Sequence, residues 1–341
     1  MARRPKRGAQ TDQRIMVKER MTMQYTLGLD IGGTKCAVLL GSTDVQNAIL
    51  HKTVFPTGQG PAQTIRLIFD AMDALLREKK VDLEDVCGMG ISCGGPLSEK
   101  SGVILGPPNL YGWDHVPIVD ILRERYPIPI RLDNDANACA VAEWKFGAAQ
   151  GCASFIFLTF GTGLGAGIIL DGRLYTGSNG MAGEVGHMRL ADFGPVGYGK
   201  AGSFEGFCSG NGIAQLAQQM ALEHIQRGER PGYCPTVEAL PTVTAKSVAD
   251  AADAGDALAR QVYAVCGEYL GRGLAVLVDI LNPEMIVLGS IFFRSEHLLR
   301  PAMERSLARE SHRISLRACK VVPAALGENI GDYAALSLAL L

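Results

Sequence analysis

A glycine-rich hairpin that occurs twice constrains this chain more than any other feature of its sequence. The first copy, YTLGLDIGGTKCAVLL, spans residues 25–40, and the second, SFIFLTFGTGLGAGIILDG, spans residues 154–172. In each copy two short apolar runs flank a turn rich in Gly and Thr, which is the pattern of a β-hairpin. When Gly32 is superposed on Gly161, Ala37 meets Ala166. The repeat predicts a chain built from two related halves.

Helical and strand patterns alternate in both halves. Residues 61–80 carry apolar side chains at helical spacing and precede a strand, VCGMGIS, that ends at Gly94. A second helix is predicted to begin near Asn134. Residues 246–280 are helical again, and the buried strand that follows them ends at Gly289. This alternation predicts an α/β protein.

Length and charge limit the class of protein further. A chain of 341 residues is long enough for two domains, and 33 Lys and Arg against 35 Asp and Glu leave no cationic excess for nucleic acid or an anionic membrane. No apolar stretch is long enough to span a bilayer. The nine cysteines are scattered without a C-x-x-C pair, which indicates buried thiols in a reducing compartment and predicts a cytoplasmic protein.

The predicted domain boundaries follow from these patterns. The first 20 residues contain seven Lys and Arg and no apolar core of a signal peptide, so residues 1–24 are predicted to be a flexible basic tail. Residues 25–134 are predicted to form an N-terminal α/β domain that the apolar helix 330–341 completes. Residues 135–329 are predicted to form a C-terminal α/β domain.

The glycine turns are the strongest candidates for phosphate binding. Neither a Walker A sequence nor a G-x-G-x-x-G after a strand is present. Glycines in a tight turn let successive backbone N–H groups point into one concavity, where phosphate oxygens bind. Asp30, at the end of a strand beside the first turn, is placed to hold the hydrated Mg²⁺ of ATP. Either hairpin alone could be ordinary structure, but the duplicated pair favours a polyphosphate site.

Two further polar sets are candidates for ligand contacts. Residues 133–137, DNDAN, place carboxylates and amides at a strand-to-helix junction, where a helix cap would explain one of them. Glu184, His187 and Glu205 occur in a glycine-rich stretch. Two carboxylates and an imidazole could hold a polyhydroxylated ligand through hydrogen bonds, although a solitary His in such a stretch is usually just solvated.

Five motifs in this order and spacing resemble the ROK family of sugar kinases and sugar-responsive repressors, within the actin-like, hexokinase-like ATPase superfamily. They are LGLDIGGTK, GGPLSEKSGVILGPPNLYGW, DNDANACA, FGTGLGAGII and GMAGEVGHMRL. The resemblance extends from about Tyr25 to the C-terminus. It implies two α/β domains of the actin-like (ribonuclease H-like) ATPase fold, with ATP and sugar in the cleft between them.

The resemblance also implies roles for individual residues. Asp135 matches the catalytic base. The positions that hold sugar hydroxyls match Asn109, Asn134, Glu184, His187 and Glu205. The positions on the ATP side match Gly32, Gly33, Thr34, Gly161, Thr162, Gly163 and Gly289, with Asp30 and Lys35 beside the first turn.

The sequence departs from the family at its zinc site. Family members follow the His with three cysteines that bind a structural zinc, whereas residues 194–205 here read GPVGYGKAGSFE. With Glu205 as the anchor, Val196, Tyr198 and Ser203 occupy the cysteine positions, and none is a normal zinc ligand. We therefore expect no structural zinc, which leaves the orientation of His187 to other contacts.

The predicted function is ATP-dependent phosphorylation of a hexose or N-acetylhexosamine, with glucose favoured. Fructose, allose, N-acetylmannosamine, N-acetylglucosamine and a β-glucoside remain open. The alternative is a catalytically silent sugar-binding protein or a sugar-responsive regulator. The family's repressors carry a DNA-binding region before the kinase-like part, and the roughly 24 residues before the first hairpin are too few for it, so no nucleic-acid partner is predicted. The resemblance implies a homodimer or homotetramer.

Overall fold

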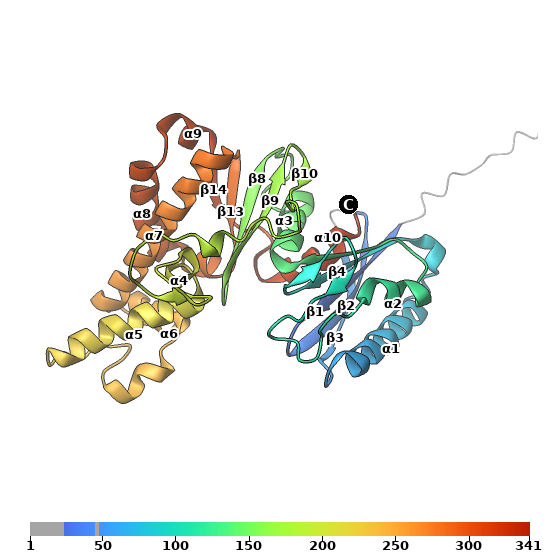
Figure 1. Ribbon diagram of the computed structural model, residues 1–341, viewed down its shortest axis with the longest axis horizontal. Helices are drawn as coiled ribbons and strands as arrows, with labels where there is room; N and C mark the ends of the chain where they lie inside the picture. The colour runs from blue at the N-terminus through green and yellow to red at the C-terminus, as the bar shows by residue number, and fades with distance from the viewer. Residues whose placement is uncertain (1–23, 45–47) are drawn as a thin grey trace, which may run out of the picture.

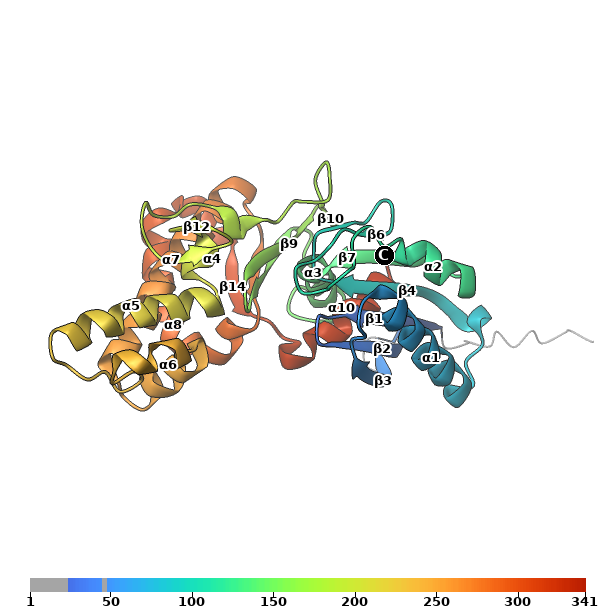
Figure 2. The ribbon, with the colours of Figure 1, turned by 60° about the horizontal axis from the view of Figure 1, so that its bottom comes forward.

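The computed structural model describes residues 24–44 and 48–341, so the predicted basic tail, apart from Gln24, lies outside the described residues. Two five-stranded sheets lie in separate lobes, with helices α3 (Asp135–Phe146) and α10 (Ile330–Leu338) between them (Figure 1, Figure 2). Within the described residues, no helix is both long and apolar enough to cross a membrane.

The first sheet has the strand order β3-β2-β1-β4-β7. Strand β1 is antiparallel to β2 and parallel to β4, and β7 continues the parallel part. The strands are β1 (Tyr25–Ile31), β2 (Lys35–Ser42), β3 (Ile49–Pro56), β4 (Val86–Cys93) and β7 (Ile130–Asn134).

The second sheet repeats this arrangement with the order β10-β9-β8-β13-β14. Its first two pairs are again antiparallel and its last two parallel. The strands are β8 (Phe155–Phe160), β9 (Leu164–Leu170), β10 (Arg173–Leu174), β13 (Met285–Leu288) and β14 (Lys320–Pro323). The glycine hairpins β1–β2 and β8–β9 occupy equivalent places, which confirms the two related halves and the α/β class.

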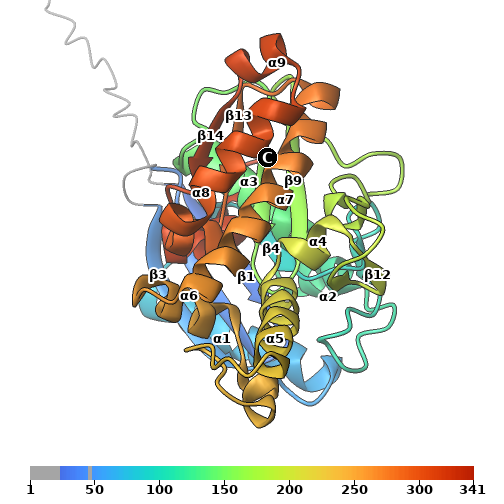
Figure 3. The same cartoon turned by 90° about the vertical axis from the view of Figure 1, so that its left-hand side faces the viewer.

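Helices cover both sheets. In the first lobe, α1 and α2 share one apolar core with the strands, whereas in the second lobe α5 to α9 lie on the outer side (Figure 3). These helices are α1 (Pro61–Lys79), α2 (Ile118–Arg125), α4 (Phe204–Phe207), α5 (Gly210–Gln226), α6 (Ala245–Asp253), α7 (Ala257–Leu281), α8 (Ile291–Glu310) and α9 (Arg313–Ala318). The helical stretch predicted over 246–280 is two helices, because Gly255 adopts a φ of 103° and Asp256 caps α7.

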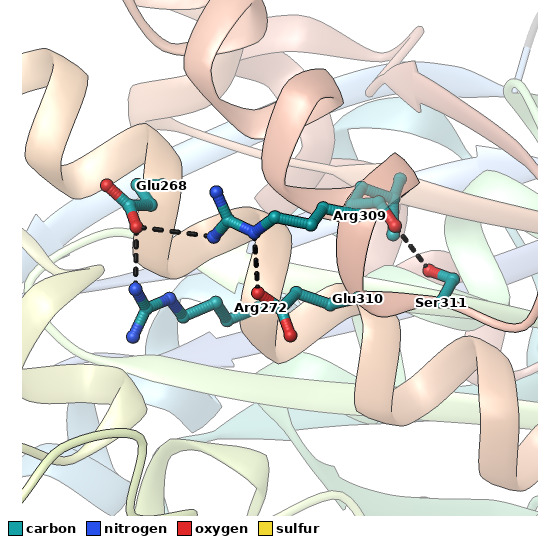
Figure 4. Close-up of polar contacts among 6 residues, drawn as sticks. Glu268, Arg272, Arg309, Glu310 and Ser311 are labelled. Atoms are coloured by element: carbon teal, nitrogen blue, oxygen red, sulfur yellow. Dashed lines mark hydrogen bonds and ion pairs between the residues drawn. The ribbon is translucent and has the colours of Figure 1, made fainter.

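Helices α7 and α8 are joined by a chain of ion pairs at one end. The carboxylate of Glu268 on α7 accepts hydrogen bonds from Arg272, one turn later, and from Arg309 of α8 (Figure 4). Arg309 also pairs with Glu310 at 2.9 Å. These side chains are partly exposed, so the network adds little stability compared with the apolar contacts between the two helices.

The last helix returns to the first sheet. A methyl group on Gly90 of β4 would overlap the carbonyl oxygen of Ala335, and one on Gly28 of β1 would lie 3.1 Å from Leu336. Glycine at these positions therefore lets α10 lie directly on the sheet. The predicted domain boundaries stay a prediction, in which this helix completes residues 25–134.

Candidate active site

Polar side chains gather at the carboxyl edge of the first sheet. Asp30 of β1 is in register with Ser92 of β4, and Ser92 with Asp133 of β7. Helix α3 begins immediately after β7, with Asn134 as its cap. Ligands of open α/β sheets bind outside the carboxyl ends of parallel strands, so this edge is where a ligand of the first lobe is expected.

Asp135 lies at the first position of α3. Solvent reaches its side chain, and its Oδ1 accepts a hydrogen bond from the backbone N–H of Ala136 at 2.9 Å. Protein surrounds the carboxyl on most sides, and this loss of hydration raises its pKa. A solvent-accessible carboxylate with a raised pKa has the properties of a general base.

Asp30 is the nearest carboxylate with a comparable environment. Its pKa is raised to about 6, first by burial and then by the negative charges of Asp332 and Asp135. Lys52 and Lys35 oppose this effect, and Lys52 forms an ion pair with Asp332 at 2.6 Å. A cation near Asp30 would relieve the repulsion between these acids.

Asp133 is the neighbouring candidate for a base, but its side chain is used in hydrogen bonds at the start of α3. Its side chain is buried, and Oδ1 accepts hydrogen bonds from the backbone N–H of Asn134 at 2.8 Å and from Asn137 Nδ2 at 2.7 Å. Burial raises its pKa to about 6. Because that oxygen holds the start of α3 in place, Asp133 is poorly placed to receive a substrate proton.

The first glycine turn, residues 32–34, joins β1 to β2. The carbonyl oxygen of Gly32 accepts a hydrogen bond from Thr57 Oγ1 at 2.6 Å, a partner that the sequence did not suggest. A methyl group on Gly33 would overlap the backbone of Asn109. The predicted sugar ligand Asn109 therefore lies against the predicted phosphate turn.

The second glycine turn, residues 161–163, joins β8 to β9. Two backbone hydrogen bonds fix this turn: Gly161 N–H donates to Gly163 O at 3.1 Å, and Gly210 N–H donates to Gly161 O at 2.7 Å. Glu205 Oε2 accepts a hydrogen bond from Leu164 N–H at 3.0 Å. The predicted sugar ligand Glu205 is thus fixed to the end of this turn through one of its two oxygens.

Gly289 lies beside the second turn. Its N–H donates to Leu158 O of β8 at 3.0 Å, and a methyl group on Gly161 would be 3.8 Å from Oγ of the next residue, Ser290. Helix α8 begins at Ile291. The geometry places the predicted adenosine-side glycine next to the predicted phosphate turn.

The start of helix α3 lies close to both glycine hairpins. Its first residue, Asp135, is close enough to Asp30 to raise the pKa of that carboxyl. Its second residue, Ala136, approaches Gly165 on β9, where a methyl group would lie 3.7 Å from the alanine Cβ. Asp135 therefore lies between the two predicted phosphate turns, although their sequence positions are far apart.

Glu184 and His187 flank the second lobe on a short 3₁₀ helix, Val185–His187. Both side chains are exposed. The imidazole of His187 meets the ring of Tyr198 edge-on, with centroids 5.0 Å apart and planes at 74°. Lys200 Nζ donates to the carbonyl oxygen of His187 at 2.6 Å. The contact with Tyr198 is therefore a candidate for what orients the imidazole, which the sequence left open.

Two of the three residues at the expected cysteine positions, Val196 and Tyr198, belong to a small hairpin formed by β11 (Val196–Gly197) and β12 (Lys200–Ala201). Val196 pairs through its backbone with Gln215, at 3.0 and 2.9 Å. Ser203 caps α4 by accepting from Gly206 N–H at 3.0 Å. Among the described residues no group of three or more His, Cys, Asp and Glu could hold a metal ion. That no zinc is bound in solution stays a prediction.

Comparison with known proteins identifies the family. The model of the ROK family matches residues 26–340, which is nearly the whole chain. The chain is a member of the ROK family. The resemblance found in the five motifs is thereby confirmed.

Relatives within the ROK family include both kinases and repressors. The glucokinase of Halalkalibacterium halodurans is 34% identical over 300 residues, which cover 86% of this chain and 89% of that protein. The xylose repressor of Caldicellulosiruptor bescii is 29% identical, over 86% of this chain and 74% of the repressor. Family membership by itself therefore leaves both kinds of activity open.

The crystal structure of a ROK family glucokinase from Streptomyces griseus in complex with glucose and AMPPNP resembles this structure with a TM-score of 0.71. The two are 29% identical, and the match covers 93% of this chain and 99% of that one. The two-lobed ROK fold of this chain is the actin-like ATPase fold, as predicted.

Proposed function

We propose that this protein phosphorylates a hexose or N-acetylhexosamine with ATP, and that glucose is the favoured sugar. One observation carries the proposal: Asp135 is a solvent-accessible carboxylate with a raised pKa at the start of α3, between two glycine turns. The likeness to two glucokinases, one of them with glucose and AMPPNP bound, supports it.

Asp135 acts as the general base in this proposal. Its free oxygen accepts the proton of the attacking sugar hydroxyl as that oxygen meets the γ-phosphorus in line. The hydrogen bond from Ala136 N–H to Oδ1 fixes the carboxylate plane, and the start of α3 stabilises its negative charge. The raised pKa makes it a stronger base than a fully hydrated aspartate.

The glycine turns bind the triphosphate. Gly33 and Thr34 present backbone N–H groups from the first lobe, and Thr162 and Gly163 present theirs from the second. Gly32 and Gly161 shape the turns, because their N–H groups donate to Lys35 O and Gly163 O. Lys35 supplies a positive charge beside the first turn, and Gly289 borders the adenosine side. Asp30 fits the role of holding hydrated Mg²⁺, because it is a desolvated oxygen ligand next to two other acids. Mg²⁺ bound with ATP neutralises charge on the transferred phosphoryl group.

The sugar contacts come from both lobes. Asn134 uses its Oδ1 to cap α3 at the N–H of Asn137, which leaves the Nδ2 group to donate to a hydroxyl. Glu205 uses Oε2 on Leu164, which leaves Oε1 to accept. The exposed side chains of Asn109, Glu184 and His187 complete the proposed set.

A panel of sugars tests the proposal directly. Glucose, fructose, allose, N-acetylmannosamine, N-acetylglucosamine and a β-glucoside are incubated with ATP and Mg²⁺, and ADP release is measured. We expect ADP release with glucose or another hexose to be faster than ADP release without any sugar. Sugar binding by calorimetry without turnover on any of them would contradict the kinase proposal.

A second function is a sugar-responsive regulator or silent sugar binder. The similarity to a xylose repressor favours it. The presence of Asp135 and of both glycine turns favours the kinase over it. The two are separated by the same panel, together with a binding assay on DNA. Assembly as a homodimer or homotetramer and a cytoplasmic location remain predictions.

A further inference from the structure

A cavity of about 590 Å³ lies where the two lobes meet, between β7 and the end of α3. Its walls come from β7, the end of α3, the β9–β10 turn and the last residues of the chain. None of the residues proposed above for sugar or ATP lines it. Its size is typical of sites for small organic molecules, about 300–1,000 Å³, and exceeds what a bare inorganic anion fills.

Four cations line this cavity, and none of them forms an ion pair with an Asp or Glu among the described residues: Lys100, Arg131, Lys145 and Arg173. Lys100 Nζ donates to the carbonyl oxygen of Ser178 at 3.2 Å, and Arg131 NH2 donates to the backbone oxygen of Leu341, the last residue of the sequence, at 2.9 Å. Lys145 Nζ lies 4.7 Å from the centre of the Trp144 ring. Positive charges in a concave surface without counter-charges attract anions.

Two acidic residues, Glu99 and Asp133, line the same cavity, so its wall carries both positive and negative charges. Glu99 Oε1 accepts a hydrogen bond from Thr176 Oγ1 at 2.8 Å. Asp133 is buried, and its pKa is raised to about 6, in part by the charge of Glu99. The four cationic and two acidic side chains leave the lining with a net positive charge. The carboxylate oxygens can accept hydrogen bonds from hydroxyl groups.

We propose that this cavity binds a sugar monophosphate at a site separate from the active site. Arg131 and Arg173 hold the phosphate, because guanidinium groups match phosphate oxygens in pairs. Glu99 and Thr176 bind hydroxyls of the carbon skeleton. Glu99 and Arg131 belong to the first lobe and Arg173 and Thr176 to the second, so the ligand contacts both.

Calorimetry with glucose 6-phosphate, in the absence of ATP, tests the proposal on the full chain. The double variant Arg131→Gln/Arg173→Gln is expected to bind it at least tenfold more weakly than the unchanged protein. Arg317→Gln, an exposed arginine on α9 outside the cavity, is the matched control and should change the Kd less than twofold. Because the readout is binding alone, the result is independent of whether the protein turns over ATP.

Three outcomes would overturn the proposal: glucose 6-phosphate binding equally to the double variant, no binding to the unchanged protein, or inorganic phosphate binding as tightly as the sugar phosphate. The first would place the ligand in the active site or elsewhere. If the double variant does not fold, the single variant Arg173→Gln is tested in its place. It is expected to bind glucose 6-phosphate at least threefold more weakly than the unchanged protein. The side chain of Arg173 is exposed at the start of β10 and makes no hydrogen bond or ion pair within the described chain.

Discussion

Two aspartates of the candidate site have protein around most of their carboxyl groups. Asp135 is flanked by both lobes, and Asp30 faces the charges of Asp135 and Asp332. Both have a raised pKa in the folded protein, so their ionised forms are less stable there than in the unfolded chain. Such a cost is typical of functional sites, and it yields two predictions.

Asp135→Asn is expected to lower kcat for the best sugar by ~10²–10⁴-fold, because the amide cannot accept the hydroxyl proton. Sugar affinity should change little, and Asn can still serve in the first turn of α3. Kcat and the sugar's Kd, by calorimetry, are measured on both proteins. A fall of less than about tenfold in a folded variant would exclude Asp135 as the base, and attention would pass to Glu184.

Asp30→Asn is expected to raise the free energy of unfolding at pH 7.5. An aspartate with a pKa of about 6 when folded and 3.8 when unfolded costs up to ~3 kcal/mol where it is ionised in both states. The cost disappears as the pH falls through 6 toward 4, since the folded carboxyl then binds a proton. Urea unfolding at pH 7.5 and 4.5 checks this, with exposed Asp120→Asn as control. Equal effects at both pH values would refute it.

Among the elements, the β11–β12 hairpin contains two of the positions, Val196 and Tyr198, where the sequence resemblance implied cysteines. Tyr198 at its turn is 79% exposed and packs edge-on against His187. An aromatic pair of this kind contributes about 0.5–1.5 kcal/mol beyond burial. The hairpin therefore contributes a ring contact to the imidazole of His187.

Tyr198→Ala is expected to raise KM for the sugar about two- to tenfold and to leave kcat nearly unchanged. Tyr198→Phe keeps the ring and should restore the original KM. Steady-state kinetics on both variants, with Phe193→Ala as an exposed aromatic control from the same loop, gives the answer. Equal KM values for the Ala and Phe variants would show that the ring contact does not position His187.

Helix α3 is also fixed at its other end by a buried acid. Glu143 is fully buried, and its two oxygens accept hydrogen bonds from the backbone N–H groups of Ala148, Ala325 and Leu326. This single side chain ties α3 to the loop that leads into α10. It lies outside the motifs, and a Glu in the middle of an apolar helix was the only signal in the sequence.

Glu143→Ala is expected to lower the free energy of unfolding by about 3 kcal/mol or more, because three backbone N–H groups lose the fully buried carboxylate that accepts their hydrogen bonds. Chemical denaturation measures the loss. Glu124→Ala, an exposed acid on α2, serves as the control and should stay within about 0.5 kcal/mol of the unchanged protein. A similar small effect at Glu143 would mean that water replaces the carboxylate.

At the scale of the whole molecule, the last helix holds the two lobes together. Helix α10 lies on the first sheet through Ala335 and Leu336 and packs against α3, which itself packs on the second sheet. Leu336 is 1% exposed. Stability of the first lobe thus depends on residues some 200 positions beyond its last strand.

Leu336→Ala is expected to destabilise the protein by about 2–5 kcal/mol, as for other buried leucines, and to expose the first lobe to protease. Thermal melting and limited proteolysis followed by mass spectrometry measure both effects. Ile314→Ala, at a 72% exposed position on α9, should leave both unchanged. First cleavage in the second lobe of the Leu336→Ala variant would contradict the predicted role of α10.

The sequence by itself determined the class of fold and the composition of the site's turns. The repeated hairpin, the helix after DNDAN and the glycine turns are local patterns, set by spacing and by residues that favour turns and caps, so they were visible without a structure. The five motifs then pointed to the ROK family. The helical pattern over 246–280 did not show the break at Gly255, because a glycine inside an apolar pattern does not by itself reveal one.

Only the tertiary structure decided which of these residues act together. Asp133 and Asp135 are chemically identical neighbours, yet one is buried under Asn134 and Asn137 while the other reaches solvent. The contact of Tyr198 with His187, the anchoring of Glu205 on Leu164 and the cavity lined by Arg131 and Arg173 join segments distant in sequence. Burial, hydration and charge neighbours depend on how the lobes pack, and no local pattern encodes them.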